Sequence, residues 1–464
     1  MAENRINADL KKSVVGIPLL LLCAANFIDG MDVSTIGVTL PAIQNGLNIS
    51  PTLSQWAVSA YVLGFGGFLL LGGRVADIFG HRRVFISALL VFTLASIAGS
   101  FVTDGSTLIA IRLIKGIAAA FTTPAAVALL LSSYKDSLDR AKALGIFAST
   151  SATGFVLGML LGGAITTVNW RLTMAMGAPV TLLVLVMTPF FFPVDKLRTE
   201  QSQRFDWIGA STVTAGLVSF VFGVTNAADH GWLDIMAWGP IAASLVLMIT
   251  FLVVEKKHAA PMVPLSIFRR VKLTHALITV AIFQGAYIGF QFVATLYYQQ
   301  SVGWSPFATG FTFVLIGIFV MLLSPRFSAM AQKRGATGLI SLGMALQVVA
   351  YTFWTLGNGH ISPVILAFLV QIPLGLGYAM VFPSVQIAVL GDIEEDKTGL
   401  ASGLFFSAFQ IGGGVILGLT SSVFGTSSHY GGNPYLWGSA FSVVLALITV
   451  LIAVSGLRKK LERV

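Results

Sequence analysis

Charged residues are scarce in this sequence, where Asp, Glu, Lys and Arg together make up only 10% of 464 residues. Soluble domains carry roughly 25% charged residues, so the composition argues against a soluble enzyme of this size. Hydrophobic residues make up 56% of the chain, and the mean hydropathy is +0.86. Because so apolar a chain could not cover its surface in water, the composition predicts a protein of the lipid bilayer.

Cysteine is almost absent, and the residue patterns of cofactor chemistry are missing too. The single cysteine, Cys23, argues against a disulfide framework and a cysteine-based metal site. The 6 histidines are scattered without metal-ligand spacing, and no segment resembles a phosphate-binding loop. We therefore expect no cofactor, no metal, no enzymatic activity and no ATP-driven step in this chain.

Long hydrophobic runs, by contrast, fill most of the sequence. A helix needs about 20 apolar residues to cross ~30 Å of hydrocarbon, and fourteen runs are long enough to span it. They lie at residues 14–41, 52–73, 84–102, 106–131, 142–165, 173–193, 207–225, 237–254, 273–298, 307–325, 337–356, 362–390, 398–423 and 435–457. No loop between them is long enough to fold alone, so the sequence predicts an all-α polytopic bundle of 14 transmembrane helices.

The distribution of basic residues supports this count. The formal net charge is +9, but nearly all Lys and Arg residues fall in one set of alternate loops and at the two termini. The other set of loops holds only Arg171. Such a bias marks the cytoplasmic side, and it predicts a multi-pass protein of the inner or plasma membrane with both termini cytoplasmic. Because topology explains the basic residues, we expect no nucleic acid partner.

Short patterns recur about 255 residues apart and indicate a duplicated unit. Ser50-Pro51 recurs as Ser305-Pro306, and the loop at 73–83 has a counterpart at 328–335. The expected division is an N-terminal six-helix bundle at 1–200, two inserted helices with a basic linker at 201–258, and a C-terminal six-helix bundle at 259–464.

The loop that carries Gly73, Asp77, Gly80, Arg82 and Arg83 resembles the signature loop of the major facilitator superfamily. The whole chain resembles in particular the fourteen-spanning drug:proton antiporter branch of that superfamily. The resemblance implies a major facilitator fold and a gating role for these five residues, whose acid and bases form a charge relay that latches the cytoplasmic side. The alternative is a solvated turn that carries cytoplasmic charge.

Two further motifs carry the resemblance. The segment Asp32-Val-Ser-Thr-Ile-Gly-Val-Thr-Leu-Pro41 is similar to the pattern of the branch's first helix. The branch's antiporter motif has its counterpart in glycines at Gly154, Gly158, Gly162 and Gly163. The resemblance places this glycine stretch at the interface between the two halves and implies a gating role, although Met159 stands where the motif has proline. Plain helix packing through small residues is the alternative.

Four ionisable residues lie deep within predicted spans, where charges are costly and usually functional. Asp29 and Asp32 are three residues apart on the first helix, and Arg112 and Lys115 are three apart on the fourth. A rise of ~1.5 Å per residue puts both pairs at similar depths, so they can neutralise one another. Asp32 is the expected proton carrier, with Asp29 as its partner or as the contact of a cationic substrate. The resemblance implies a coupling role for Arg112. A static salt-bridge network is the alternative.

Polar side chains on the second half predict the opposite wall of a cavity. Gln284, Tyr287, Gln291 and Tyr298 share one stripe on the ninth helix. Amide and aromatic walls suit bulky amphiphilic molecules, whereas hydrogen bonding between helices is the alternative. The full set expected to contact substrate is Asp29, Asp32, Gln55, Arg112, Lys115, Gln284, Tyr287, Gln291, Tyr378 and Gln410.

These features predict a secondary active transporter that exports drug-like compounds in exchange for protons by alternating access. We expect small amphiphilic substrates, cationic or neutral, and a functional monomer. Lys115 stands where the antiporter branch often has glutamine, and a second buried cation favours an alternative, the export of an organic anion, a siderophore or a lipid. A non-transporting membrane receptor is a further alternative.

Overall fold

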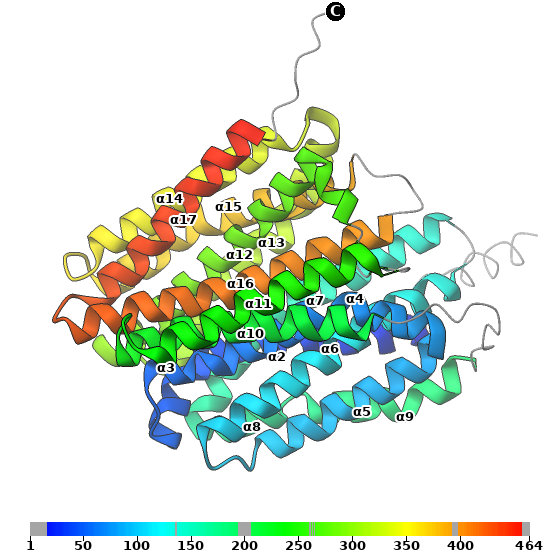
Figure 1. Cartoon of the computed structure of the whole chain (residues 1–464), viewed down its shortest axis with the longest axis horizontal. Coiled ribbons are helices and arrows are strands. Elements are labelled where there is room, and N and C mark those ends of the chain that lie inside the picture. Colours follow the sequence, from blue (N-terminus) through cyan, green and yellow to red (C-terminus); the bar gives the residue numbers. More distant parts are fainter. Residues whose placement is uncertain are drawn as a thin grey trace, which may run out of the picture.

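The computed structural model describes residues 16–134, 137–193, 206–258, 261, 263, 265–391 and 398–456. Every regular element within these ranges is a helix, and the long helices run side by side along one direction (Figure 1). This outcome follows from the composition, because a chain in hydrocarbon must satisfy its backbone hydrogen bonds internally, and a helix does so within one segment.

The first part of the chain, up to residue 193, forms eight helices within the described residues. They are α2 (Ile17–Leu47), α3 (Pro51–Ser54), α4 (Trp56–Phe79), α5 (His81–Gly99), α6 (Gly105–Ser133), α7 (Ser137–Val168), α8 (Trp170–Ala175) and α9 (Ala178–Phe191). Two helices follow, α10 (Trp207–His230) and α11 (Ile235–Lys257).

The last part begins with the short 3-10 helix η2 (Leu265–Arg269) and continues with α12 (Val271–Leu296), which ends in a π-helical turn, η3 (Tyr297–Ser301). The remaining helices are α13 (Pro306–Arg334), α14 (Thr337–Gly357), α15 (Pro363–Leu390), α16 (Thr398–His429) and α17 (Pro434–Gly456).

Each predicted apolar run overlaps one or more of these helices. The prediction of an all-helical membrane protein is confirmed, whereas the count of fourteen spans is not. Among the described residues, 12 helices are long and apolar enough to cross a membrane, or up to 13 if the two parts of α4 form one span. Those parts meet at a bend of 53°. The apolar portion of α7 is shorter and covers Thr153–Val168. The structure therefore gives an all-helical membrane fold with 12 to 13 candidate spans.

The two sets of helices repeat one packing pattern. In the first set α2 packs against α7 and α9, and α6 packs against α4 and α5; in the second set α12 packs against α16 and α17, and α15 packs against α13 and α14. The two sets meet mainly where α7 packs on α13 and where α4 packs on α16.

The repeated sequence patterns occupy equivalent places in the two sets. Ser50 and Ser305 each cap a helix that starts with proline, and their hydroxyls accept hydrogen bonds from the backbone N–H groups of Leu53 at 3.0 Å and Ala308 at 3.2 Å. Gly80 and Gly335 end α4 and α13 with φ values of 96° and 90°, a conformation that disfavours every residue except glycine. We name the two ends of the bundle the Ser50 end and the Asp77 end.

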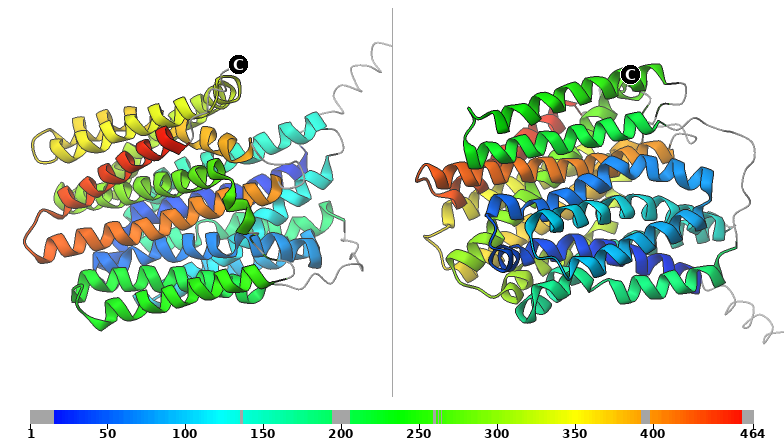
Figure 2. Two further views of the ribbon diagram at one scale, coloured as in Figure 1. Left: turned by 45° about the horizontal axis from the view of Figure 1, so that its top comes forward. Right: turned by 60° about the horizontal axis from the view of Figure 1, so that its bottom comes forward.

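Helix α10 lies beside the junction between the two sets. It packs on both α4 and α16, whereas α11 packs on α10 and leaves most of its surface exposed (Figure 2). A Cβ atom on Gly418 of α16 would lie 2.7 Å from the Val221 side chain, so this side chain packs directly on the α16 backbone. On the α4 side, Gln55 Nε2 donates a hydrogen bond to Thr225 Oγ1 at 3.3 Å.

Candidate functional site

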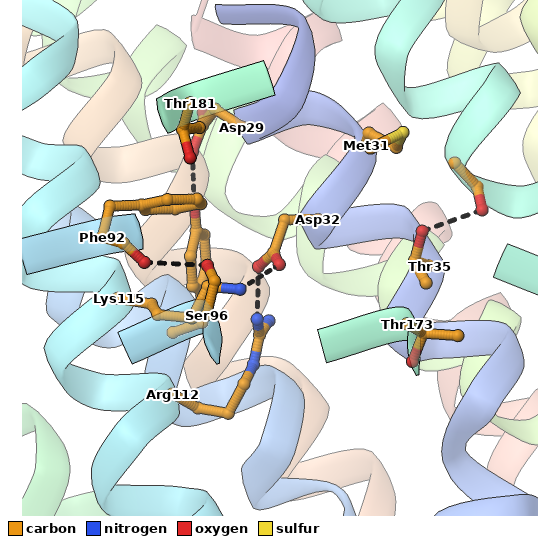
Figure 3. A network of polar contacts seen from close by, with 12 residues as sticks. Asp29, Met31, Asp32, Thr35, Phe92, Ser96, Arg112, Lys115, Thr173 and Thr181 are labelled. Carbon is orange, nitrogen blue, oxygen red and sulfur yellow. Dashed lines mark hydrogen bonds and ion pairs between the residues drawn. The ribbon is translucent and has the colours of Figure 1, made fainter. Parts of the chain in front are cut away.

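The charged residues predicted within the spans come together around Asp32. Arg112 donates to one carboxylate oxygen of Asp32 and Lys115 donates to the other (Figure 3). The side chains of Arg112, Lys115 and Asp32 are 0%, 1% and 8% exposed, respectively. Burial is tolerable because each charge has an opposite charge in direct contact, and removing one partner from such a cluster is costly.

Arg112 also ties α6 to α4. Its Nε donates to the carbonyl oxygen of Ala57 at 2.6 Å, and its guanidinium carbon lies 4.5 Å from the centre of the Tyr61 ring. A second cation–π contact puts Lys115 Nζ 4.8 Å from the centre of the Phe92 ring. The remaining guanidinium nitrogen of Arg112 is buried and has no hydrogen-bond partner among the described residues.

Asp29 has a different environment from Asp32. Its carboxylate accepts a hydrogen bond from the Tyr61 hydroxyl, and in the described part of the chain it forms no ion pair within 4 Å. The two acids therefore lie one turn apart on α2, but both neighbouring cations contact Asp32.

The polar residues predicted on the second half form a cluster of amides and aromatic rings. The Tyr378 hydroxyl donates to Gln284 Oε1 at 3.0 Å, and the ring centres of Tyr378 and Tyr287 are 5.0 Å apart. The Tyr287 hydroxyl is buried and has no hydrogen-bond partner in the part of the chain that the structure describes. The Phe155 ring of α7 lies 6.4 Å from the Tyr287 ring, which joins this cluster to the first half.

A cavity lies between the two halves next to this cluster. Its lining includes Val33 and Gly37 of α2, Phe155 of α7 and Gln291 of α12. Gln291 Nε2 also contacts Met159 Sδ at 3.4 Å across the junction. The sequence did not single out Val33 or Phe155, because apolar side chains on a helix that is apolar on every face give no signal of which face meets a cavity.

Three of the predicted polar residues lie outside this cluster and this cavity. Gln55 contacts α10 and the Ser59 hydroxyl, which donates to it at 2.6 Å. Gln410 is buried where α16 packs on Gly66 of α4. Tyr298, a member of the predicted stripe, accepts a hydrogen bond from Trp354 Nε1 at 2.9 Å inside the second set of helices.

The residues of the predicted gating loop lie at the Asp77 end. Asp77 is 70% exposed, and its carboxylate lies 3.1 Å from His81 Nε2. Arg82 donates to the carbonyl oxygen of Pro189 at 3.2 Å, and Gly73 packs near Pro124. A gating role for these residues stays a prediction.

The glycine motif of α7 packs mainly within its own half. Added Cβ atoms at three of its glycines would meet α2, namely Gly154, Gly158 and Gly162. Only Gly163 faces α13, where a Cβ would lie 2.6 Å from the carbonyl oxygen of Pro306. The stretch as a whole nevertheless lies between the halves, as expected, because Cβ atoms added to Gly310 and Gly317 of α13 would meet the same stretch of α7.

Glutamines that the sequence analysis did not select join the two halves at the Ser50 end. The π-helical turn η3 carries Gln299 and Gln300, whose amide nitrogens donate to the carbonyl oxygen of Val38 at 2.8 Å and to Gln44 Oε1 at 2.6 Å. Gln44 Nε2 in turn donates to Ser54 Oγ at 2.8 Å. We call Gln44, Gln299 and Gln300 the glutamine latch. Their signal in the sequence is a pair of adjacent amides at the end of an apolar run.

Comparison with known proteins extends over nearly the whole chain. The family model of the Major Facilitator Superfamily matches residues 22–417. The chain is 31% identical to the cephamycin export protein CmcT of Amycolatopsis lactamdurans, in an alignment that covers 95% of this chain and 93% of that protein. It is also 31% identical to the puromycin resistance protein pur8 of Streptomyces alboniger, with 94% and 90% covered.

Solved structures share the fold at lower sequence identity. The fold is similar to that of a peptide transporter, POT, crystallised in complex with sulfate, with a TM-score of 0.70, 17% identity and 95% of each chain covered. It is also similar to the xylose transporter XylE from E. coli, with a TM-score of 0.64, 15% identity, and 96% and 97% covered.

Proposed function

Because the chain belongs to the major facilitator superfamily, we propose that it exports small amphiphilic drug-like compounds, cationic or neutral, in exchange for protons. The observation that carries this proposal is the pairing of buried charges in one half with an uncharged aromatic wall in the other. A cavity lies between the two halves beside that wall. The named relatives that export cephamycin or confer puromycin resistance support the export of antibiotics.

We propose fourteen membrane spans for this transporter. The twelve long apolar helices, the bent helix α4 and helix α7 with its apolar stretch Thr153–Val168 give that number. The division is then a six-helix bundle at 1–200, inserted helices at 201–258 and a second six-helix bundle at 259–464. The protein acts as a monomer in the inner or plasma membrane, since each copy contains both walls of the cavity.

The concentration of basic residues puts the Asp77 end and both termini in the cytoplasm. The glutamine latch then closes the opposite, outer end, so the structure is consistent with a state that faces the cytoplasm. Transport requires the two helix sets to rock about the central cavity, which breaks the latch when the outer side opens.

Proton coupling is proposed for the cluster of Asp29, Asp32 and Arg112. A carboxylate in this place can take up a proton when it faces the outside and release it to the cytoplasm after the halves reorient. Asp29 also lies one turn from Val33 in the cavity, where it can attract a cationic substrate. The proton gradient would supply the driving force, without a bound cofactor.

The test is ethidium accumulation in a bacterial host that lacks its own efflux pumps. Cells that express the protein are expected to accumulate less ethidium than cells with an empty vector, because export lowers the internal concentration. A protonophore is expected to abolish the difference. Equal accumulation, with the protein verified in the membrane, would contradict export of cationic amphiphiles.

A second candidate substrate class is the organic anion. Two observations favour it: one buried guanidinium nitrogen of Arg112 has no hydrogen-bond partner within the described ranges, and Lys115 adds a second cation at the same place. We expect Lys115→Gln to weaken resistance to an anionic cephamycin if anions bind here, and to leave resistance to cationic puromycin unchanged. Growth inhibition by the two antibiotics measures both effects, and the reverse pattern would exclude the anion class.

A further inference from the structure

The two carboxylates of α2 differ in the free-energy cost of binding a proton. Protonating Asp32 would weaken its ion pairs with both Arg112 and Lys115 and leave buried cations uncompensated, which is costly in hydrocarbon. Asp29 has no such pair, and its neighbour is the Tyr61 hydroxyl. A hydroxyl can donate or accept, so the contact between Asp29 and Tyr61 can persist whether the carboxyl is protonated or ionised.

Asp29 also lines a cavity that the sequence did not reveal. The cavity lies within the first set of helices, on the Asp77 side of Asp29, and its polar lining includes Asn26, Thr122, Thr123 and Thr181. It has room for a water molecule, and hydroxyl and amide groups can hold one by hydrogen bonds. Phe147 lines the cavity on the α7 side.

Asp29 thus stands between two cavities. The cavity between the halves begins at Val33, four residues of α2 or about 6 Å further toward the Ser50 end. The hydroxyl-lined cavity begins at Asn26 on the opposite side. A proton can therefore leave through one set of helices while a substrate occupies the space between the two sets.

Resting on the proposed proton-coupled export, we propose that Asp29 carries the transported proton and exchanges it with the cytoplasm through the hydroxyl-lined cavity, whereas Asp32 stays ionised. In the release step the O–H bond of the Asp29 carboxyl breaks, and the proton passes to water in the cavity. The resulting carboxylate keeps its hydrogen bond from Tyr61. This assignment replaces the expectation that Asp32 carries the proton.

Few ionisable groups face Asp29. Helix α4 contributes Tyr61, α6 contributes Arg112 and Lys115, and α2 itself contributes Asp32. The lining of the cavity from α5, α7 and α9 consists of Leu89, Phe92, Phe147 and Thr181, which carry no charge. We therefore assign the pH-dependent change of charge at this place to Asp29, whereas Arg112, Lys115 and Asp32 keep their charges.

Infrared difference spectroscopy of the purified full-length protein in detergent tests this assignment without any substrate. We expect a band from a protonated carboxyl at mildly acidic pH that disappears as the pH rises. Asp29→Asn should abolish the band, Asp29→Glu should retain a shifted band, and Asp77→Asn should leave it unchanged. An unchanged band in Asp29→Asn, or no titrating carboxyl band in the wild type, would overturn the proposal.

Transport in proteoliposomes separates this proposal from the proposed function. Asp29→Asn is expected to let ethidium move down its own gradient and to lose the stimulation by an imposed pH gradient. Thr122→Val, which removes one hydroxyl from the cavity, is expected to slow the proton-driven flux several-fold and to spare the passive flux. If the wild type moves no ethidium while the infrared band behaves as expected, the substrate class fails and the assignment of Asp29 stands. Full pH stimulation in Asp29→Asn would overturn the assignment itself.

Discussion

Cross-linking position 44 to position 300 is expected to stop transport almost completely. Gln44 belongs to the first half and Gln300 to the second, and their side chains are in hydrogen-bond contact at 2.6 Å. A covalent link between them would hold the outer end closed, so the halves could not rock. The variant is Gln44→Cys with Gln300→Cys in a Cys23→Ser background, joined by a short reducible cross-linker, and the measurement is ethidium efflux before and after reduction.

The chain offers a matched control for this experiment. Gln44 also contacts Ser54 at 2.8 Å, and both residues lie in the first half. Linking Gln44→Cys to Ser54→Cys is expected to leave efflux intact, because it joins parts that move together. Efflux that persists in the variant linked between positions 44 and 300, with cross-linking verified, would contradict alternating access through this end.

Replacing Asp32 by asparagine is expected to destabilise the fold by about 3–5 kcal/mol, the usual cost of removing one partner of a buried ion pair. The reason is that Arg112 and Lys115, which are both fully buried, would lose their only carboxylate in direct contact among the described residues. The measurement is the free energy of unfolding of the purified protein in detergent, where the fold is reversible, or otherwise the midpoint of thermal unfolding.

Two further variants make this prediction specific to the charge cluster. Asp77→Asn removes an exposed carboxylate and is expected to change stability by no more than about 0.5 kcal/mol. Adding Lys115→Gln to Asp32→Asn should restore part of the lost stability, since one of the two unpaired cations is removed. Wild-type stability in Asp32→Asn would show that the cluster does not hold α2 and α6 together.

The sequence predicted which residues belong to the site better than it predicted the contacts between them. Spacing alone put Asp29, Asp32, Arg112 and Lys115 at one depth, because the rise of a helix is fixed. It could not predict that both cations would contact Asp32, since this depends on how α2 and α6 are rotated about their axes. Helices that are apolar on all faces carry little information about rotation.

The same ambiguity limits what the glycine motif predicts. Four glycines along α7 indicate close approach to another helix, but they do not identify that helix. The structure uses three of them to bring α7 against α2 and only Gly163 to bring it against α13. Likewise Gln55 is a polar residue within a predicted span, yet one of its partners is Thr225 of α10, which the sequence could not place.

The position of α10 has a consequence for motion. A rigid helix that packs on both α4 and α16 cannot keep both contacts unchanged when those two helices rotate relative to each other. The α4 side includes a hydrogen bond between Gln55 and Thr225, whereas the α16 side presents Gly418 to Val221. A glycine also faces α10 on the α4 side, where a Cβ atom on Gly67 would lie 2.4 Å from the Thr214 side chain. In each transport cycle at least one of these two contacts of α10 would therefore have to change.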